Sequence, residues 1–247
     1  MRLVHACSSI IVILCVLFFY NKPIVTGAAE NGQKAEVPRQ EHRVQVPFIE
    51  NQGDIENKEV AFFAQTFGGF GTVYVEKNGT LVYNFPLKDK NNVSFKEIFT
   101  DKHISLNPLE PPPENVIEMF KGKGYIDQNS SISNFYRMHL GEIYKGIVLE
   151  FTAYTDTIEK LFTVSPQGNP QAIKIEIQGA KGLKVDESGK MEIITERGSG
   201  QFTRPFASQI IKDQKIFVEV SYVVTKGTAY SFKLGKYDKT IPLMILF

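Results

Sequence analysis

A two-residue alternation of apolar and polar side chains, repeated from Ile143 onward, constrains the fold of this chain more than any other feature. In residues 147–153 and 173–178, apolar side chains occupy every second position. Successive side chains of a β-strand point to opposite faces, so each run predicts a strand with one covered face. Such faces are covered when sheets pack on one another or curl. The sequence therefore predicts an all-β fold, either a sandwich or curled antiparallel sheets.

Two short loops predict where strands reverse. Asn78-Gly79 lies between two β-rich runs, and Asn-Gly is a strong hairpin signal because both residues accept a positive φ. Glu187-Ser188-Gly189 predicts a second hairpin in the same way. Two later alternating runs are each expected to place their side chains on one face of a strand: Ile216, Val218, Val220, Tyr222 and Val224 in the first, and Tyr230, Phe232 and Leu234 in the second.

The first 28 residues are typical of a secretory signal peptide. Arg2 precedes an apolar run over Ile10–Tyr20, and small residues follow at Gly27-Ala28-Ala29. A membrane-spanning helix needs about 20 apolar residues, and this run is shorter. A charged start, a short apolar helix and a small-residue exit predict cleavage between Gly27 and Glu30. An uncleaved membrane anchor remains as the alternative.

Cysteine usage and charge narrow the class of protein further. Cys7 and Cys15 both lie in the predicted signal peptide, so residues 29–247 contain no cysteine and form no disulfide. Lys and Arg total 28 and Asp and Glu total 27, so no strong field favours a nucleic-acid partner. We expect an exported bacterial protein, periplasmic, extracellular or at the cell surface. It would meet the membrane only through the signal segment before cleavage.

Composition predicts three segments along the chain. Residues 1–28 are the signal peptide, 29–45 a polar flexible linker, and 46–247 a β-rich module. Prolines at 108 and 111–113 are incompatible with a central strand, so they mark a loop. This loop suggests two lobes, with a boundary near residues 108–115. The run that follows, residues 115–120, fits either a strand or one helical turn.

No motif for catalysis, metal binding or a cofactor is visible. The four histidines lack the spacing of a zinc site. There is no G-x-S-x-G nucleophile motif and no G-x-x-x-x-G-K-[ST] phosphate loop. Carboxylates lie close in sequence at Glu50, Asp54 and Glu56 and at Asp186-Glu187, and we interpret them as solvated loop residues rather than a glycosidase pair. We therefore expect no catalytic residue, no metal site and no cofactor.

The segment Phe48-Ile-Glu-Asn-Gln-Gly53 sets two apolar residues beside three hydrogen-bonding side chains. In the interpretation we favour, Glu50 and Asn51 cap a turn that closes onto Phe48 in the core. In the functional alternative, Glu50, Asn51 and Gln52 bind a sugar or a peptide. These three residues are the candidate binding site of the sequence.

Several stretches, in their order and spacing, resemble those of a known bacterial family. They are Phe48–Gly53, Val60–Thr66, Thr72–Val75, Gly141–Leu149, Glu159–Pro166, Gly168–Ile173, Gly179–Leu183 and Gly235–Asp238. Together they resemble the domain of uncharacterised function that precedes SBBP (β-propeller) repeats in secreted and cell-surface proteins. The resemblance covers roughly residues 46–246. It implies an exported, β-rich accessory module beside a repeat array, although no propeller repeat follows here and no Trp is present.

The favoured function is therefore a non-enzymatic module in cell-surface or extracellular assembly and interaction. Its partner is unknown, with a surface protein or a β-propeller domain as the possibilities. One rival is a carbohydrate-binding module that stacks sugars on an aromatic platform, with candidates at Tyr125, Phe135, Tyr136 and Tyr144. The other rival is a glycoside hydrolase that uses carboxylates such as Glu50.

The last five residues, Leu243-Met-Ile-Leu-Phe247, are all apolar. Alternation predicts that Leu243 and Ile245 are buried in a final strand, with Met244 and Leu246 less protected. The alternative is an exposed apolar edge, which would recruit partners or aggregate.

Overall fold

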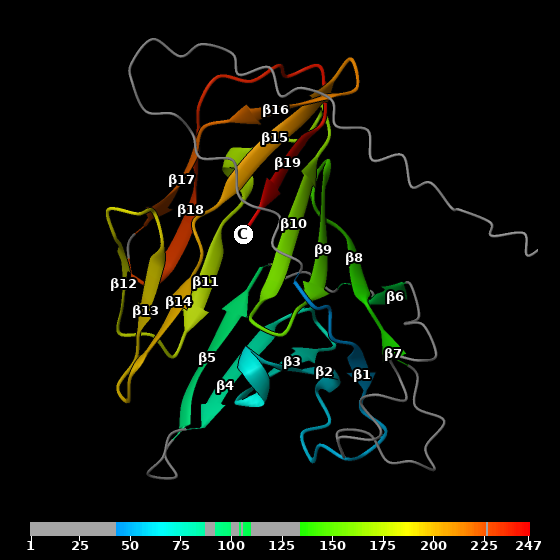
Figure 1. The fold of residues 1–247 in the computed structure, drawn as a ribbon, viewed down its shortest axis with the longest axis vertical. Helices are drawn as coiled ribbons and strands as arrows, with labels where there is room; N and C mark the ends of the chain where they lie inside the picture. Colours follow the sequence, from blue (N-terminus) through cyan, green and yellow to red (C-terminus); the bar gives the residue numbers. More distant parts are fainter. Residues whose placement is uncertain (1–42, 87–91, 100–103, 105, 110–133, 226) are drawn as a thin grey trace, which may run out of the picture.

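A computed structural model describes residues 43–86, 92–99, 104, 106–109, 134–225 and 227–247. Nearly all their regular structure is β, and the strands form three antiparallel sheets (Figure 1). The expected all-β class is confirmed. The predicted signal-peptide helix and the run 115–120 lie outside the described residues.

The largest sheet has nine strands in the order β17-β18-β11-β5-β4-β3-β2-β1-β7. In chain order these strands are β1 (Phe48–Glu50), β2 (Val60–Thr66), β3 (Gly71–Glu76), β4 (Leu81–Pro86), β5 (Asn92–Ile98), β7 (Asn134–Phe135), β11 (Ile175–Gln178), β17 (Val220–Val224) and β18 (Ala229–Leu234). Within this sheet β5 pairs with β11, with Ile98 opposite Glu176. Strands from both sides of the predicted lobe boundary thus share one sheet.

The second sheet has seven strands in the order β16-β15-β19-β10-β9-β8-β6. They are β6 (Asn107–Leu109), β8 (Arg137–Tyr144), β9 (Ile147–Ala153), β10 (Ile158–Val164), β15 (Phe206–Ile211), β16 (Gln214–Val218) and β19 (Leu243–Leu246). A third sheet contains β12 (Gly182–Val185), β13 (Met191–Ile194) and β14 (Ser199–Phe202). Two short 3-10 helices, η1 (Phe67–Gly69) and η2 (Pro170–Ala172), complete the described elements. Among these residues, no helix has the length and apolar character to cross a bilayer.

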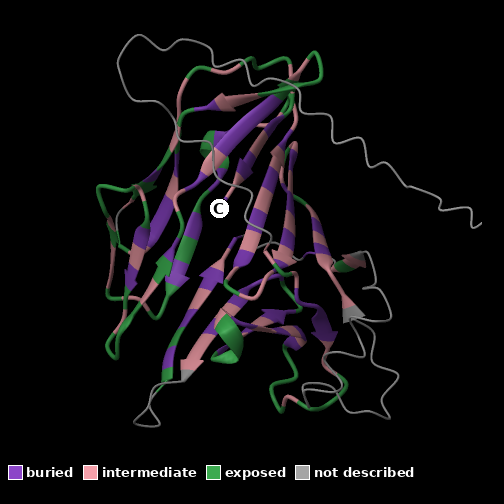
Figure 2. Cartoon of the chain, in the orientation of Figure 1, coloured by how far each residue is buried: buried purple, intermediate pink, exposed green. Residues whose placement is uncertain are grey.

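The inner faces of the sheets form one apolar core. Buried and part-exposed residues alternate along the strands, as Figure 2 shows. The ring of Phe162 on β10 lies 6.2 Å from that of Phe232 on β18, and Phe99 lies 5.2 Å from Phe151 on β9. These contacts join the two large sheets. No division of the described core corresponds to the two lobes that the prolines suggested.

The two predicted hairpins are both present. In the first, the Glu76 amide donates to the Thr80 carbonyl across 2.9 Å and Gly79 has a φ of 80°. That positive φ is strained for a residue with a Cβ, and a Cβ there would also press on the Ile104 and Leu140 side chains, so the turn favours glycine. Asn78 acts differently from the expectation, because its side-chain oxygen accepts from the Thr80 amide at 3.0 Å and its φ is not positive. The second hairpin joins β12 to β13.

The prediction that residues 216–224 form one alternating strand is wrong, because the structure divides them between two strands. Ile216 and Val218 belong to β16 in the seven-stranded sheet, whereas Val220 and Tyr222 belong to β17 in the nine-stranded sheet. The chain changes sheets at Glu219, whose carbonyl accepts from the Gly235 amide across 2.8 Å. The alternating pattern does not reveal this change of sheet. Every second residue faces the core both before and after Glu219, so the alternation continues without a break.

The predicted flexible linker extends three residues too far. The Thr155 amide donates to the Val44 carbonyl, and Gln45 forms a β-bridge with Tyr154. The Arg43 guanidinium lies 3.2 Å from Asp156 Oδ1 and 4.1 Å from the centre of the Tyr154 ring. Residues 43–45 thus belong to the folded module, held at the β9–β10 turn.

The predicted burial of the last strand is confirmed. Strand β19 lies between β10 and β15, so it is paired on both sides. Leu243 and Ile245 are buried, Met244 and Leu246 are partly exposed, and Phe247 is buried beyond the end of the strand. The final residues are therefore a central part of the sheet and not an exposed apolar edge.

Candidate functional site

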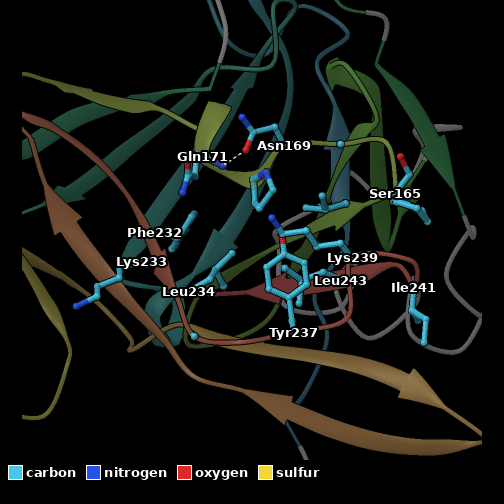
Figure 3. A pocket seen from close by; sticks show the side chains of 15 residues that line it. Ser165, Asn169, Gln171, Phe232, Lys233, Leu234, Tyr237, Lys239, Ile241 and Leu243 are labelled. Atoms are coloured by element: carbon cyan, nitrogen blue, oxygen red, sulfur yellow. Dashed lines mark hydrogen bonds between the residues drawn. The ribbon is translucent and has the colours of Figure 1, made fainter.

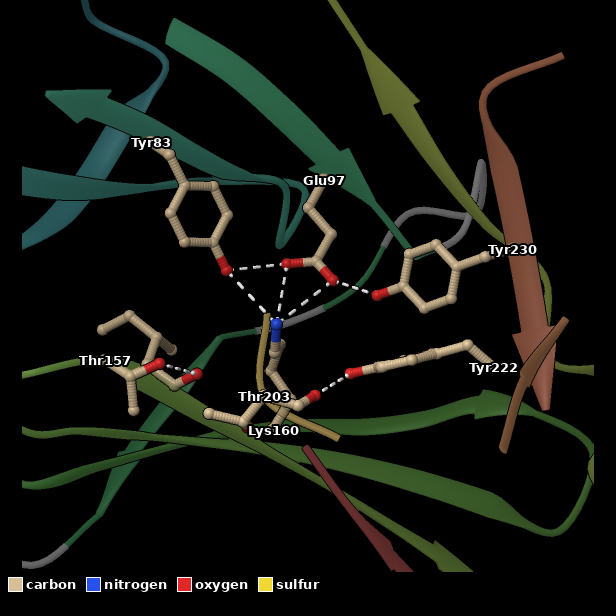
Figure 4. Close-up of polar contacts among 8 residues, drawn as sticks. Tyr83, Glu97, Thr157, Lys160, Thr203, Tyr222 and Tyr230 are labelled. Atoms are coloured by element: carbon tan, nitrogen blue, oxygen red, sulfur yellow. Dashed lines mark hydrogen bonds and ion pairs between the residues drawn. The ribbon is translucent and has the colours of Figure 1, made fainter. Parts of the chain in front are cut away.

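Ionisable side chains meet inside the core in a cluster that we call the enclosed centre: Glu97, Lys160, Tyr83, Tyr222 and Tyr230 (Figure 4). Glu97 lies on β5, and the tyrosines lie on β4, β17 and β18, all in the nine-stranded sheet. Lys160 lies on β10 in the seven-stranded sheet. The enclosed centre therefore connects the inner faces of the two large sheets.

The alternation that builds the strands also directs both charges inward. Phe95 and Glu97 are consecutive buried positions of β5, and Lys160 and Phe162 are consecutive buried positions of β10. The exposed fraction of the side chain is 2% for Lys160 and 0% for Glu97. Two residues of opposite charge thus occupy positions that would otherwise be apolar.

The Glu97 carboxylate accepts hydrogen bonds on both oxygens. Lys160 Nζ lies 3.1 Å from Oε2 and 3.3 Å from Oε1. The Tyr83 hydroxyl donates to Oε2 across 2.7 Å, and the Tyr230 hydroxyl donates to Oε1. Lys160 Nζ also lies 3.4 Å from the Tyr83 oxygen. The buried charges are therefore paired and hydrogen-bonded, which offsets the free energy of removing them from water.

Aromatic rings close the enclosed centre around the ammonium group. Lys160 Nζ lies 3.8 Å from the centre of the Phe202 ring and 4.5 Å from that of Phe247. A cation over a ring face is attracted by the ring quadrupole, most strongly where water is absent. Phe202 ends β14 and Phe247 follows β19. The third sheet and the C-terminal residues thus help to seal the centre.

Burial shifts the proton equilibria of these groups. It raises the pKa of Tyr83, Tyr222 and Tyr230 well above the ordinary value, and the nearby Glu97 charge raises each further. Burial also lowers the pKa of Lys160, and the Glu97 charge opposes that shift. The phenols are therefore stable hydrogen-bond donors, while the lysine is held closer to its neutral form than a surface lysine.

The burial of the enclosed centre limits which molecules can reach its charged groups. With Glu97 and Lys160 almost fully buried, a dissolved substrate does not reach the carboxylate or the amine. Removing one member of a buried ion pair leaves an uncompensated charge and strongly destabilises a protein. The arrangement suits a joint between two sheets better than a site that turns over a substrate.

The apolar residues of the strands do not by themselves predict the enclosed centre. The signal is a charged residue at an inward position of an alternating run: Glu97 follows Val93 and Phe95, and Lys160 lies between Ile158 and Phe162. Such a signal indicates that a charged residue is buried, but it does not identify the residue with which that charge pairs. That the two are partners depends on the packing of β5 against β10, which no local pattern reveals.

The second candidate site is a surface hollow with a volume of about 610 Å³. It lies between the loop after β10 and the loop between β18 and β19 (Figure 3). The polar and aromatic side chains that line it are Ser165, Asn169, Gln171, Phe232, Lys233, Tyr237 and Lys239. This volume lies within the range of pockets that bind small molecules.

Hydrogen bonds fix both walls of the hollow. Gln209 on β15 is buried, and its side-chain nitrogen donates to the carbonyls of Asp238 at 2.7 Å and Ile241 at 2.9 Å. Its oxygen accepts from the Asp238 amide at 2.9 Å. On the other wall, the Ser165 amide donates to the Gly146 carbonyl at 2.8 Å. The hollow is thus preformed rather than a gap between loose loops.

The sequence candidates Glu50, Asn51 and Gln52 lie away from both sites, at the end of β1. The Asn51 side chain donates to the carbonyls of Ile55 and Val60 and accepts from the amides of Gly53 and Ile55. This is the turn-forming role expected for Asn51. Glu50 is half-buried and Gln52 is exposed, so their binding role stays a prediction.

The aromatic platform proposed from the sequence is only partly described. Tyr125 lies outside the described residues, and Phe135 packs edge-on against Phe62 at 6.1 Å. The Tyr144 hydroxyl donates to the carbonyls of Phe99 and Lys174, which ties β8 to two other segments. Phe135 and Tyr144 thus pack within the fold. The hollow has two aromatic residues, the buried Phe232 and Tyr237, and the sequence did not single out Tyr237, whose ring is partly buried against the core.

The fold and its sites define the class of protein: an all-β module with an ion pair and tyrosine hydroxyls buried between its two large sheets. Residues 48–245 match the model of a family described as "Domain of unknown function (DUF7948)", and the chain belongs to this family. The match agrees with the expectation of an uncharacterised domain over most of the chain. No curated protein and no solved structure matches the chain.

Proposed function

We propose that this chain is an exported, non-enzymatic module of a bacterial cell-surface or extracellular protein, with a structural or interaction role. The observation that supports it most is the enclosed centre. A buried ion pair on facing sheets, sealed by aromatic rings, stabilises the module internally and offers nothing to a dissolved substrate. The apolar N-terminal run supports export, and the resemblance to the domain preceding SBBP repeats supports a place in surface proteins.

Export and the absence of turnover are tested on the full chain expressed in a bacterial host. We expect the protein in the periplasm or medium, with an intact mass that places its N-terminus near Ala29. Recovery in the cytoplasm with Met1 present would contradict export. The same preparation is incubated with a panel of polysaccharides beside a Glu50→Gln variant. Release of reducing ends by the unaltered protein, and not by the variant, would contradict a non-enzymatic role.

The hollow favours one more specific function, carbohydrate binding. Tyr237 provides a ring for stacking, while Asn169 and Gln171 provide amide groups that both donate and accept hydrogen bonds, as sugar hydroxyls require. Electrophoresis in gels containing soluble polysaccharides measures this directly. We expect at least one polysaccharide to retard the protein and Tyr237→Ala to abolish the retardation. The matched control is Phe70→Ala, which removes an aromatic side chain that is 79% exposed on η1–β3. Equal loss in both variants, or no retardation at all, would reject the hollow as a sugar site.

A further inference from the structure

The amine of Lys160 and the carboxyl group of Glu97 are held together, without access to bulk water, by contacts from two sheets. We propose that these side chains condense to an intramolecular isopeptide bond, which joins β10 to β5 covalently. This self-modification is independent of the proposed function and requires only groups that the enclosed centre already contains.

The first requirement is proximity. Lys160 Nζ contacts both carboxylate oxygens, and the reacting groups come from strands that are 63 residues apart in sequence. Both strands are paired on each side within their sheets, so neither side chain can drift away from the other. Holding two groups in contact in this way gives a large effective concentration, which removes much of the entropic barrier to their reaction.

The second requirement is the neutral form of both groups. An ammonium ion has no lone pair, and a carboxylate is a poor electrophile, so one proton must first move from Nζ to a Glu97 oxygen. An environment of low dielectric constant favours the neutral pair over the ionised pair. Burial likewise lowers the pKa of Lys160, which favours the neutral amine. The rings of Phe202 and Phe247 exclude the water that would restore the charges.

The tyrosines are placed to assist the bond-forming step. As the amine nitrogen attacks Glu97 Cδ, the C–N bond forms and the carbonyl electron pair moves onto Oε1, to which Tyr230 donates a hydrogen bond. The Tyr83 oxygen lies 3.4 Å from Nζ and 2.7 Å from Oε2. Tyr83 can thus accept a proton from the nitrogen while it gives its own to Oε2.

The atoms balance without any co-reactant. Oε2 receives two protons, one before the attack and one through Tyr83, and the C–Oε2 bond breaks to release water. The nitrogen keeps one hydrogen and becomes an amide. An ammonium and a carboxylate are thereby converted to one amide and one water molecule. The product contains no buried charge, and its carbonyl oxygen keeps the hydrogen bond from Tyr230.

An isopeptide bond would stabilise a module that has no cysteine with which to form a disulfide. Residues 29–247 contain no cysteine, so no disulfide staples the module after the predicted cleavage. A covalent link between β5 and β10 closes a long loop and reduces the entropy of the unfolded chain, as a disulfide does. The link joins the two large sheets at their shared core.

Mass spectrometry of the folded, unaltered protein tests the proposal. After denaturation, we expect an intact mass lower than the sequence mass by one water molecule, and a digest with a branched peptide that links Lys160 to Glu97. A full sequence mass after prolonged incubation of the folded protein overturns the proposal. So does a loss of water that maps to any other position, such as a succinimide.

Two variants sharpen this result. Glu97→Ala removes the carbonyl and should restore the full sequence mass in whatever fraction folds. Tyr83→Phe keeps the ring and removes the proton relay, and it should slow the mass change after refolding by about a hundredfold or more. An unchanged rate would overturn the role of Tyr83. If Glu97→Ala does not fold, the branched peptide from the unaltered protein still decides the question.

Discussion

The enclosed centre and the surface hollow use similar residues in opposite environments. Each contains lysine and tyrosine side chains, but Lys160 is almost fully buried, whereas Lys233 and Lys239 are exposed to water. In the centre every charge has a fixed partner. In the hollow the lysines are solvated and the backbone, through Gln209, supplies the rigidity.

This difference separates stability from recognition. A buried charge without its partner is strongly destabilising, while a solvated surface charge contributes little to the free energy of unfolding. We therefore expect changes in the centre to lower stability, and changes in the hollow to leave the fold intact while altering what the module binds.

The largest effect is expected from truncation after Pro242. It removes β19 from between β10 and β15 and takes Phe247 from the wall of the centre. Each large apolar side chain so lost contributes about 1.5–3 kcal/mol, against a total stability of about 5–15 kcal/mol for a typical domain. We expect no cooperative thermal transition and more light scattering. An unchanged melting temperature with reduced self-association would show that the tail is dispensable.

Single alanine substitutions in the centre come next. Lys160→Ala or Glu97→Ala leaves one buried charge unpaired, and each should lower the free energy of unfolding in urea by about 3–5 kcal/mol. The matched control is Lys233→Ala in the hollow, which should change it by no more than about 0.5 kcal/mol. Similar losses for Lys160→Ala and Lys233→Ala would remove the contrast between the two regions.

The centre should also make the fold sensitive to alkali. The pKa values of Tyr83, Tyr222 and Tyr230 are raised in the folded state, so the folded protein holds these protons above pH 10.0, where the unfolded chain releases them. Stability from these phenols is complete below that pH and is lost as the pH rises through the folded pKa values. The lowered pKa of Lys160 acts in the opposite direction, but it is one group against three.

Urea unfolding below and above the ordinary tyrosine pKa measures this effect. We expect stability to fall above pH 10, and Tyr222→Phe to make that fall shallower. Tyr222 is the best probe, since its hydroxyl bonds to the Thr203 carbonyl and not to Glu97. A flat profile, or a Tyr222→Phe profile as steep as that of the unaltered protein, would argue against protonated, enclosed phenols.

The smallest effect on stability is expected in the hollow. Tyr237→Ala should lower the free energy of unfolding by about 1 kcal/mol, because the Tyr237 ring is only partly buried against the core. Gln209→Ala should cost more, about 1–3 kcal/mol, because it leaves the Asp238 and Ile241 carbonyls without their buried donor. Both variants should weaken any ligand binding at the hollow. Thermal melting beside the gel-retardation assay separates the two effects, and a large melting shift for Tyr237→Ala would show that its ring is structural.

Local sequence patterns predict the strands well and the sites poorly. Alternation identified β9 and β18, because burial on one face of a strand repeats every second residue. It did not reveal the change of sheet at Glu219 or the pairing of Glu97 with Lys160, because both depend on how distant strands pack. The hollow is likewise assembled from two loops that Gln209 and backbone contacts bring together. By contrast, the turn-forming role of Asn51 is local and was foreseeable from its segment.

The central claim is that Glu97 and Lys160 act together as the joint between the two large sheets. A double-mutant cycle with Glu97→Leu and Lys160→Met tests it most directly, with the free energy of unfolding measured for all four proteins. The account predicts that each single variant is strongly destabilised, that the double variant recovers much of the loss, and that the coupling exceeds about 1.5 kcal/mol. Effects that add to within about 0.5 kcal/mol would show that the two side chains act independently and would contradict the account.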